Sequence, residues 1–208
     1  MTDSTPMDGD HYFSAAPATP DQRRTLRVRL AGRDVEVQTA RGVFSADRVD
    51  LGTSVLLREV PDPPERGDLL DLGCGWGPVA LTMAMLSPGA TVWAVDVNAR
   101  ALDLVRRNAE SLGLRNVRPA TPEEVPDDVR FAALWSNPPI RVGKTELHAL
   151  MTRWLPRLDD GASAYLVVQR HLGADSLHSW LRHTMPDLDT TRVGSAKGFR
   201  VLRVHRAG

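Results

Sequence analysis

Short apolar runs alternate with amphipathic stretches along most of the chain, and this pattern indicates strands separated by helices. The clearest helix is predicted over 98–112, because Asn98 is a favoured cap, apolar residues recur with a helical period, and Gly113 ends it. Such alternation is typical of an α/β fold, with a mostly parallel sheet that has helices on both faces. Strands are predicted near 68–72, 91–96, 116–119, 131–136, 162–168, 189–193 and 200–205, and two further helices over 78–86 and 145–157.

The first 60 residues form a predicted extension that precedes this α/β region. Apolar residues and arginines alternate from Leu26 to Leu30, residues 31–34 supply a turn, and a second alternating run follows, which predicts a β-hairpin. A short helix is then predicted, capped near Thr53 and ended by a group of prolines. We therefore divide the chain into an N-terminal extension, 1–60, and a main domain, 61–208.

Composition limits the size and setting of the protein. A chain of 208 residues with 42% hydrophobic content suffices for one α/β domain with a short extension. No apolar run reaches the roughly 18 to 20 residues of a membrane span, and the start lacks signal-peptide features, so we expect a soluble, cytoplasmic protein. Because Cys74 is the single cysteine and no Cys/His group has zinc-ligand spacing, neither an internal disulfide nor a metal is expected.

Charge is balanced overall but uneven along the chain. A formal net charge of zero removes the simplest argument for a nucleic-acid partner, which depends on a basic surface. Basic residues nevertheless gather without any acid between Arg23 and Arg33 and between Arg192 and Arg206. These two stretches are either phosphate contacts or solvated arginine-rich faces, and the sequence leaves both readings open.

A glycine-rich segment joins the first strand of the main domain to the helix after it. Gly73 and Gly75 let the backbone approach a ligand, Cys74 lies between them, and Gly77 lets the helix begin close to the strand. On its own the segment is equally an ordinary glycine turn. In the order strand, glycine turn, helix, it predicts a loop that binds a nucleoside-bearing ligand.

Three residues around this loop restrict the ligand further. Asp96, followed by Val97, ends the next strand, where its carboxylate can accept both hydroxyls of a ribose. The dinucleotide fingerprint requires glycine where Pro78 stands, so NAD fits poorly. Asp71 would repel a pyrophosphate but can help to hold an ammonium group such as that of a methionine moiety. A nucleoside ligand that carries positive charge is therefore predicted.

A second motif, Asn137-Pro138-Pro139, follows the fourth strand of the main domain, at the edge where open α/β sheets place their sites. Prolines cannot donate hydrogen bonds, so the carbonyls of this turn and the side-chain oxygen of Asn137 are free to accept. A planar amine held by two acceptors keeps its lone pair directed at an electrophile, which requires positioning rather than a strong base. Alone, the motif is more often a rigid turn.

These segments together resemble the class I methyltransferases, in which the glycine loop corresponds to motif I, the strand ending at Asp96 to motif II and the Asn-Pro-Pro turn to motif IV. More specifically, the chain is similar to the small-domain methyltransferases, the group that contains the ribosomal small-subunit RNA guanine-N2 methyltransferases. The flanking segments that carry this narrower match are His11-Tyr12-Phe13-Ser14, Gly42-Val43-Phe44-Ser45, Val49-Asp50-Leu51-Gly52-Thr53, the residues from Asn137 to Lys144, and Gly198-Phe199-Arg200-Val201-Leu202.

The resemblance implies a fold, a cofactor and a set of site residues. It implies a Rossmann-like sheet of seven strands in the order 3-2-1-4-5-7-6 with the last strand antiparallel, and S-adenosylmethionine as the cofactor. An acid or amide that the family usually carries at the end of the third strand, to meet the adenine amino group, is absent around Ala120 and Thr121. The implied cofactor-binding residues are Phe44, Thr53, Asp71, Gly73, Cys74, Gly75, Gly77, Asp96, Val97 and Asn137, and the implied catalytic residues are Asn137, Pro138 and Pro139.

The implied substrate side follows the Asn-Pro-Pro turn. Ile140 stands where the family usually has an aromatic residue that stacks on the target base, and Arg141 and Lys144 are candidate phosphate contacts, although they are equally plain solvated charges. Gln169, Arg170 and His171 follow the fifth strand and could line the mouth of the substrate site.

These residues lead to one hypothesis and several alternatives. We expect an N-methyltransferase that modifies guanine N2 of small-subunit ribosomal RNA and acts as a monomer or homodimer. The alternatives within catalysis are a protein-glutamine or a DNA-adenine N-methyltransferase, since both nitrogens suit the same turn. A non-catalytic RNA-binding or partner-binding module that retains the fold is the alternative from another class.

Overall fold

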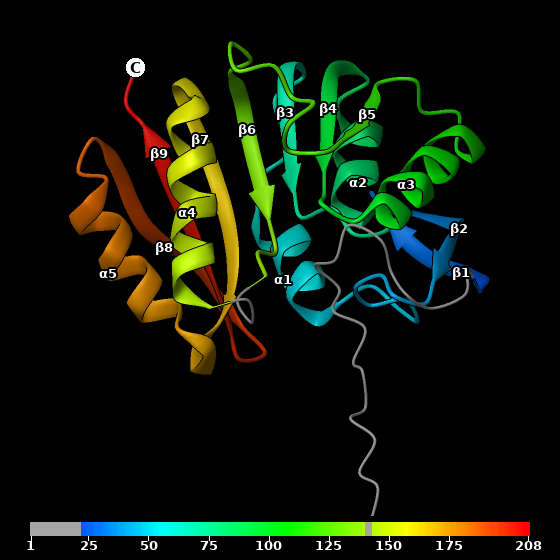
Figure 1. Cartoon of the computed structure of the whole chain (residues 1–208), viewed down its shortest axis with the longest axis horizontal. Helices are drawn as coiled ribbons and strands as arrows, with labels where there is room; N and C mark the ends of the chain where they lie inside the picture. The colour runs from blue at the N-terminus through cyan, green and yellow to red at the C-terminus, as the bar shows by residue number, and fades with distance from the viewer. Residues whose placement is uncertain (1–21, 140–142) are drawn as a thin grey trace, which may run out of the picture.

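A computed structural model describes residues 22–139 and 143–208, and it contains a seven-stranded sheet and a separate hairpin (Figure 1). The sheet order is β5-β4-β3-β6-β7-β9-β8, in which β9 is antiparallel to both of its neighbours and the pairs among β5, β4, β3, β6 and β7 are parallel. The expected order with an antiparallel last strand is confirmed. The strands are β3 Arg66–Leu72, β4 Gly89–Val95, β5 Val117–Ala120, β6 Phe131–Ser136, β7 Leu158–Gln169, β8 Leu188–Ala196 and β9 Phe199–Arg206.

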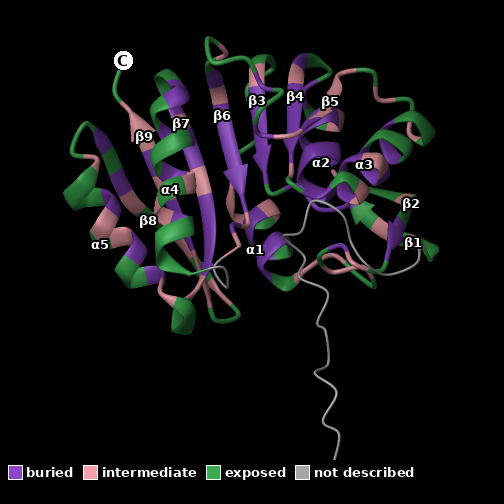
Figure 2. Cartoon of the chain, viewed as in Figure 1, coloured by how far each residue is buried: buried purple, intermediate pink, exposed green. Residues whose placement is uncertain are grey.

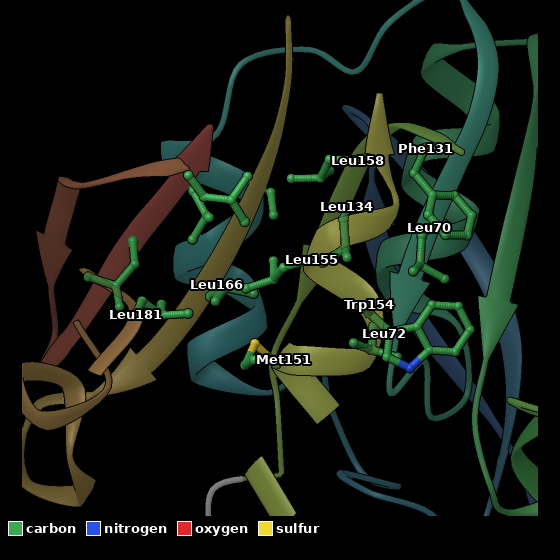
Figure 3. Packing of buried hydrophobic residues seen from close by; sticks show 14 of the residues in the cluster. Leu70, Leu72, Phe131, Leu134, Met151, Trp154, Leu155, Leu158, Leu166 and Leu181 are labelled. Atoms are coloured by element: carbon green, nitrogen blue, oxygen red, sulfur yellow. The ribbon is translucent and has the colours of Figure 1, made fainter. Parts of the chain in front are cut away.

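The helices cover both faces of this sheet, as predicted. Successive residues of a strand point to opposite faces, so Leu70 packs with α4 and α5, whereas Leu69 packs with α1, α2 and α3. Figure 3 shows the first of these clusters, in which Leu134 of β6 lies with Met151 and Trp154 of α4. Figure 2 shows the central strands buried between the two helical layers. The helices are α1 Leu51–Glu59, α2 Pro78–Leu86, α3 Ala99–Ser111, α4 Lys144–Trp154 and α5 Ala174–Thr184.

Two helix boundaries differ from the prediction. The helix predicted over 145–157 ends at Trp154, and Leu155–Arg157 forms a 3₁₀ turn, because Pro156 cannot donate the backbone hydrogen bond that an α-helix needs. The cap of α1 is Asp50 rather than Thr53, since the Asp50 carboxylate accepts hydrogen bonds from the backbone N–H groups of Gly52 and Thr53. Thr53 therefore lies in the first turn of the helix, and the cap carries a charge.

The N-terminal hairpin consists of β1 Arg23–Leu30 and β2 Arg33–Ala40, joined by a turn of two residues rather than the predicted four. Asn108 of α3 fixes this hairpin to the main body of the protein. Its amide exchanges hydrogen bonds with the backbone of Gln38 in β2, at 2.6 and 3.0 Å, and also donates to the carbonyl of Trp76 at 3.1 Å. The hairpin therefore places the segment after it, 41–50, beside the glycine loop.

The helix α1 packs on the same face of the sheet as α2 and α3. Val55 and Leu56 are buried in the same cluster as Leu69 of β3 and Val167 of β7. The division of the chain at residue 60 stays a proposal. The contact between α1 and β7 holds the start of α1 at the carboxyl edge of the sheet, where the candidate site lies.

Candidate active site

A hollow lies at the carboxyl ends of β3 and β6, where the start of α1 meets the glycine loop. It has about 350 Å³ of space between atoms, part of it open to solvent. Residues far apart in sequence meet here, and most of the predicted cofactor-binding residues are among them. The hollow is lined by Phe44, Ser45, Asp50, Thr53, Asp71, Gly73, Cys74, Gly75, Trp76, Pro78, Val79 and Asn137.

The backbone donors of the glycine loop are used within the protein. The N–H groups of Gly73 and Cys74 both donate to the carbonyl of Val95, at 2.8 and 3.0 Å, and the N–H of Gly75 donates to the Asp96 carboxylate at 2.9 Å. A phosphate-binding loop presents such groups to its ligand instead. This loop therefore offers close approach to a ligand but little hydrogen bonding to an anion.

The start of α2 also has few free N–H groups to donate to an anion. Pro78 has no N–H, and the N–H of Ala80 donates to the Asp71 carboxylate at 2.8 Å. Gly77 begins the helix with a φ of 98°, and a Cβ at this position would lie 3.1 Å from Val105 of α3. The predicted reason for Gly77 therefore needs correction, since the glycine permits close packing on α3 rather than on the strand. These features agree with the prediction that NAD fits poorly.

Asp71 is a buried carboxyl group whose ionised form is poorly stabilised by its surroundings. One oxygen accepts from Ala80, and the other has no partner among the described residues. Burial raises the pKa of Asp71 from 3.8 to about 8, the Ala80 hydrogen bond opposes this shift, and the charge of Asp96 adds to it. A cation in the hollow would favour the ionised carboxylate. The sequence-based assignment of a cationic group to Asp71 thus has a physical basis.

Asp96 holds the loop with both of its oxygens. One accepts from Gly75 and the other from the N–H of Asn98, each at 2.9 Å. Burial raises the pKa of Asp96, while these hydrogen bonds act in the opposite direction. Asp96 and Val97 lie outside the residues that line the hollow, and Val97 is exposed. Their contact with a ribose stays a prediction.

Cys74 is buried, and its thiol is not a nucleophile in this setting. Burial raises the pKa of the Cys74 thiol well above its ordinary value, and the carboxylates of Asp96 and Asp71 raise it further. The sulfur is 3.7 Å from the carbonyl oxygen of Gly75. Because the thiolate is the reactive form, chemistry through a cysteine adduct is disfavoured.

Asn137 has a defined orientation at the opposite wall of the hollow. Its amide nitrogen donates to the Asp50 carboxylate at 2.8 Å and to the Thr53 hydroxyl at 3.1 Å. A carboxylate only accepts hydrogen bonds, so the nitrogen must face Asp50 and the carbonyl oxygen must face away. That oxygen has no hydrogen-bond partner among the described residues. Asn137 can therefore accept a hydrogen bond from a ligand, as predicted, while Pro138 and Pro139 stiffen the turn.

Asp50 is a residue of the candidate site to which sequence reasoning assigned no role. The same carboxylate oxygen that accepts from Asn137 also accepts from the N–H groups of Gly52 and Thr53. An aspartate three residues before a helical threonine is a recognisable cap signal, but nothing local links it to an asparagine 87 residues later.

The segment 41–50 closes the hollow from the hairpin side. The indole N–H of Trp76 donates to the Ser45 carbonyl at 3.2 Å, and the Asn98 amide donates to the Gly42 carbonyl at 2.9 Å. These bonds hold Phe44, which is 45% exposed, over the glycine loop. Phe44 and Thr53 both line the hollow, so their predicted contact with a cofactor is geometrically feasible.

The predicted substrate residues are only partly described. Ile140 and Arg141 lie outside the described residues. Lys144 is the first residue of α4 and is exposed. In the described part of the chain, no group of three or more His, Cys, Asp or Glu residues is placed to hold a metal ion. Over the same residues, no helix has the length and apolar character needed to cross a membrane.

Gly52→Ala is predicted to destabilise the protein although alanine usually favours a helix. A Cβ at position 52 would lie 2.9 Å from the Asp50 carboxylate and 2.9 Å from the Phe199 ring. Overpacking typically costs about 1–3 kcal/mol against a helix-propensity gain of about 1 kcal/mol, so the net effect is destabilising over most of that range. Urea unfolding should show a lower free energy of unfolding for the variant. The control is Leu51→Ala, at an exposed position in the same turn of α1. Equal stability of Gly52→Ala and wild type would contradict the packing argument.

Comparison with known proteins identifies relatives over most of the chain. The methyltransferase small domain family matches residues 34–203. The Bacillus subtilis protein YbxB, whose function is uncharacterized, is 31% identical over 200 residues, which cover 95% of this chain and 98% of that protein. Ribosomal RNA small subunit methyltransferase C of Shewanella amazonensis is 31% identical over 160 residues, which cover 75% of this chain and 46% of that protein.

A solved structure supports the fold. The 16S rRNA N2 methyltransferase of T. thermophilus, in complex with AdoMet and guanosine, superimposes with a TM-score of 0.75 at 24% identity. The match covers 90% of this chain and 51% of that one. The present chain thus spans about half the length of the methyltransferases that it matches.

Proposed function

This chain belongs to the methyltransferase small domain family, and on that basis we propose that it transfers a methyl group from S-adenosylmethionine to guanine N2 in small-subunit ribosomal RNA. The names of the relatives support the substrate class, since the Shewanella protein is a ribosomal RNA small subunit methyltransferase and the T. thermophilus structure contains guanosine. We also propose that the protein is cytoplasmic, acts as a monomer or homodimer and uses no metal cofactor.

The residues of the hollow fit S-adenosylmethionine. This cofactor supplies a methyl group on a positively charged sulfur and carries an ammonium group on its methionine end. Asp71 offers a buried carboxylate oxygen, and the glycine loop has few free donors for an anion. In this proposal Asp71, Phe44 and Thr53 hold the methionine end, Gly73, Cys74, Gly75 and Gly77 form the floor, and Asp96 and Val97 contact the nucleoside.

The orientation of Asn137 is the observation that carries the proposed chemistry. Because its nitrogen is held by Asp50 and Thr53, its free carbonyl oxygen can accept from an exocyclic N–H of the target. That hydrogen bond fixes the plane of the amine and directs its lone pair at the methyl group, so the rate gain comes from alignment. Pro138 and Pro139 keep the adjoining carbonyls available as a second acceptor. Ile140, Arg141 and Lys144 remain the proposed contacts to the target base and its phosphates.

Labelled methyl transfer tests the substrate class. The purified protein is incubated with methyl-labelled S-adenosylmethionine and, separately, with small ribosomal subunits, protein-free small-subunit RNA, ribosomal proteins and DNA. We expect label in RNA, recovered as N2-methylguanine after digestion to nucleosides. Label confined to protein or DNA would support a glutamine or adenine methyltransferase instead. Absence of calorimetric binding at millimolar S-adenosylmethionine would support a non-catalytic module.

Asp50→Ala is predicted to impair catalysis, at a cost of about 1 kcal/mol for the lost helix cap. Alanine has no oxygen to accept from Asn137, whose amide then keeps only the Thr53 hydroxyl as a partner and loses its fixed orientation. Asp50→Asn is the matched control, because a single side-chain oxygen accepts from Gly52, Thr53 and Asn137 and asparagine retains one. Misplacement of one positioning group costs about a hundredfold in rate. We therefore expect kcat to fall by about that factor, with a nearly unchanged KM for S-adenosylmethionine. A parallel loss of thermal stability large enough to unfold the variant at the assay temperature would show a structural role instead.

A further inference from the structure

The tip of the β8–β9 hairpin lies against the first turn of α1. A Cβ on Gly52 would be 2.9 Å from the Phe199 ring, so this ring packs directly on the helix start. The same helix start carries Asp50, which holds Asn137. Lys197 precedes Phe199 by two residues and is exposed. Lys197 therefore lies at the rim of the site that contains Asn137.

Arg170 reaches the same rim from the neighbouring strand. Gln169 at the end of β7 pairs with Phe199, and the N–H of Arg170 donates to the Gly198 carbonyl at 2.8 Å. On its other side β7 pairs with β6, in a register that places Leu166 beside Ser136. Arg170 thus follows β7 at the edge of the sheet where Asn137 follows β6, and Figure 1 shows this end of β7 beside the hairpin tip.

The two cations are not neutralised by the described part of the protein. Neither Arg170 nor Lys197 forms an ion pair with a described residue, and both are exposed. The nearby carboxylates are already engaged. Asp175 at the start of α5 pairs with Arg192 and Arg200, and Asp50 is occupied by its backbone donors and Asn137. An unneutralised pair of positive charges beside the site favours an anionic ligand.

We propose that Arg170 and Lys197 bind phosphate groups of the RNA strand that carries the target base, and this rests on the proposed function. Phosphate contacts of this kind position a nucleic acid without reading its sequence. The zero net charge of the chain fits a small local contact rather than a broad basic groove. Specificity for the base then comes from Asn137 and its turn, while the two cations fix the register of the strand.

The backbone at Lys197 allows a charge to be removed without damage to the fold. Lys197 and Gly198 form a turn of two residues with φ values of 49° and 82°. Both values are positive, as in the type I′ turn, for which asparagine followed by glycine is the preferred sequence. Lys197→Asn should therefore keep or raise thermal stability, and any loss of function in it reports the lost charge.

The test compares Lys197→Asn, Arg170→Gln and the double variant with wild type. The control is Arg115→Gln, an exposed arginine before β5 at the opposite edge of the sheet. For the double variant we expect the KM for small-subunit RNA to rise about tenfold, with kcat and calorimetric binding of S-adenosylmethionine within twofold of wild type. The slope of log affinity against log salt should decrease by about 0.7 per lost contact.

RNA binding, measured by fluorescence anisotropy without cofactor, separates this inference from the proposed function. If wild type methylates RNA and the double variant keeps its KM and salt slope, the phosphate site is wrong and the function stands. If wild type binds RNA through these cations but transfers no methyl group to it, the function is wrong and the phosphate site stands. An equal loss in Arg115→Gln would overturn the site, because the effect would then be one of general charge.

Discussion

Asn137→Ala is expected to reduce kcat for methyl transfer by about a hundredfold or more, while the affinity for S-adenosylmethionine changes by less than about threefold. The substitution removes the carbonyl oxygen that would align the target amine. It leaves Asp71 and the glycine loop in place, because the hydrogen bonds of the Asn137 side chain go to Asp50 and Thr53. The loss therefore falls on alignment rather than on cofactor binding.

Single-turnover kinetics and calorimetry measure the two quantities separately. Asn137→Asp is an informative second variant, since it keeps two acceptor oxygens but places a carboxylate 2.8 Å from the position of Asp50. Repulsion between the two carboxylates should prevent rescue. Equal loss of cofactor affinity and of methyl transfer in Asn137→Ala would show that Asn137 holds the cofactor and not the target.

Asp71→Asn is expected to weaken binding of S-adenosylmethionine by roughly 10- to 150-fold, because a hydrogen bond to a charged group is worth about 1.5–3 kcal/mol. Asparagine can still accept from Ala80, so the start of α2 should be retained. Calorimetry between about pH 6 and pH 7 tests the assignment further, since the amino group of the ligand stays protonated there. Wild-type affinity should rise with pH as Asp71 ionises, and the variant should show no such rise.

The same substitution should change how stability depends on pH in the cofactor-free protein. Asp71 ionises at its ordinary pKa of 3.8 in the unfolded chain but at about 8 in the folded protein. The folded state therefore binds more protons between these values, and the stability contributed by this group is complete below 3.8 and lost as pH rises to about 8. Asp71→Asn removes this loss. Its free energy of unfolding relative to wild type should increase from about pH 5 to pH 8, and a constant difference would contradict the buried carboxyl assignment.

The sequence alone predicted the order of strands and helices because the relevant signals are local. The period of apolar residues identifies each element, and the cap at Asn98 is confirmed, since its side chain accepts from Arg100 and Ala101. The glycine loop and the Asn-Pro-Pro turn were also visible, because both depend on special backbone properties of glycine and proline. Helix ends were less accurate, as the 3₁₀ turn after Trp154 shows.

The tertiary structure decided which of these local features act together. Asp50 and Asn137 are 87 residues apart, and their contact exists because α1 packs on β7 and thereby stands beside the end of β6. No local pattern encodes that pairing, which also determines the direction in which the Asn137 oxygen faces. The raised pKa of Asp71 depends in the same way on burial, which is a property of the packed molecule.

The sequence thus sufficed to predict the α/β class, a nucleoside-binding loop, a poor fit for NAD and an acceptor turn, since each prediction depends on residues close together in the chain. The folded structure was needed to show that Asp50 orients Asn137 and that the donors of the loop are used internally, and to infer that Arg170 and Lys197 share the rim of the site. Distances between segments that are far apart in sequence, and the burial of charge, are set by the packing of the whole chain.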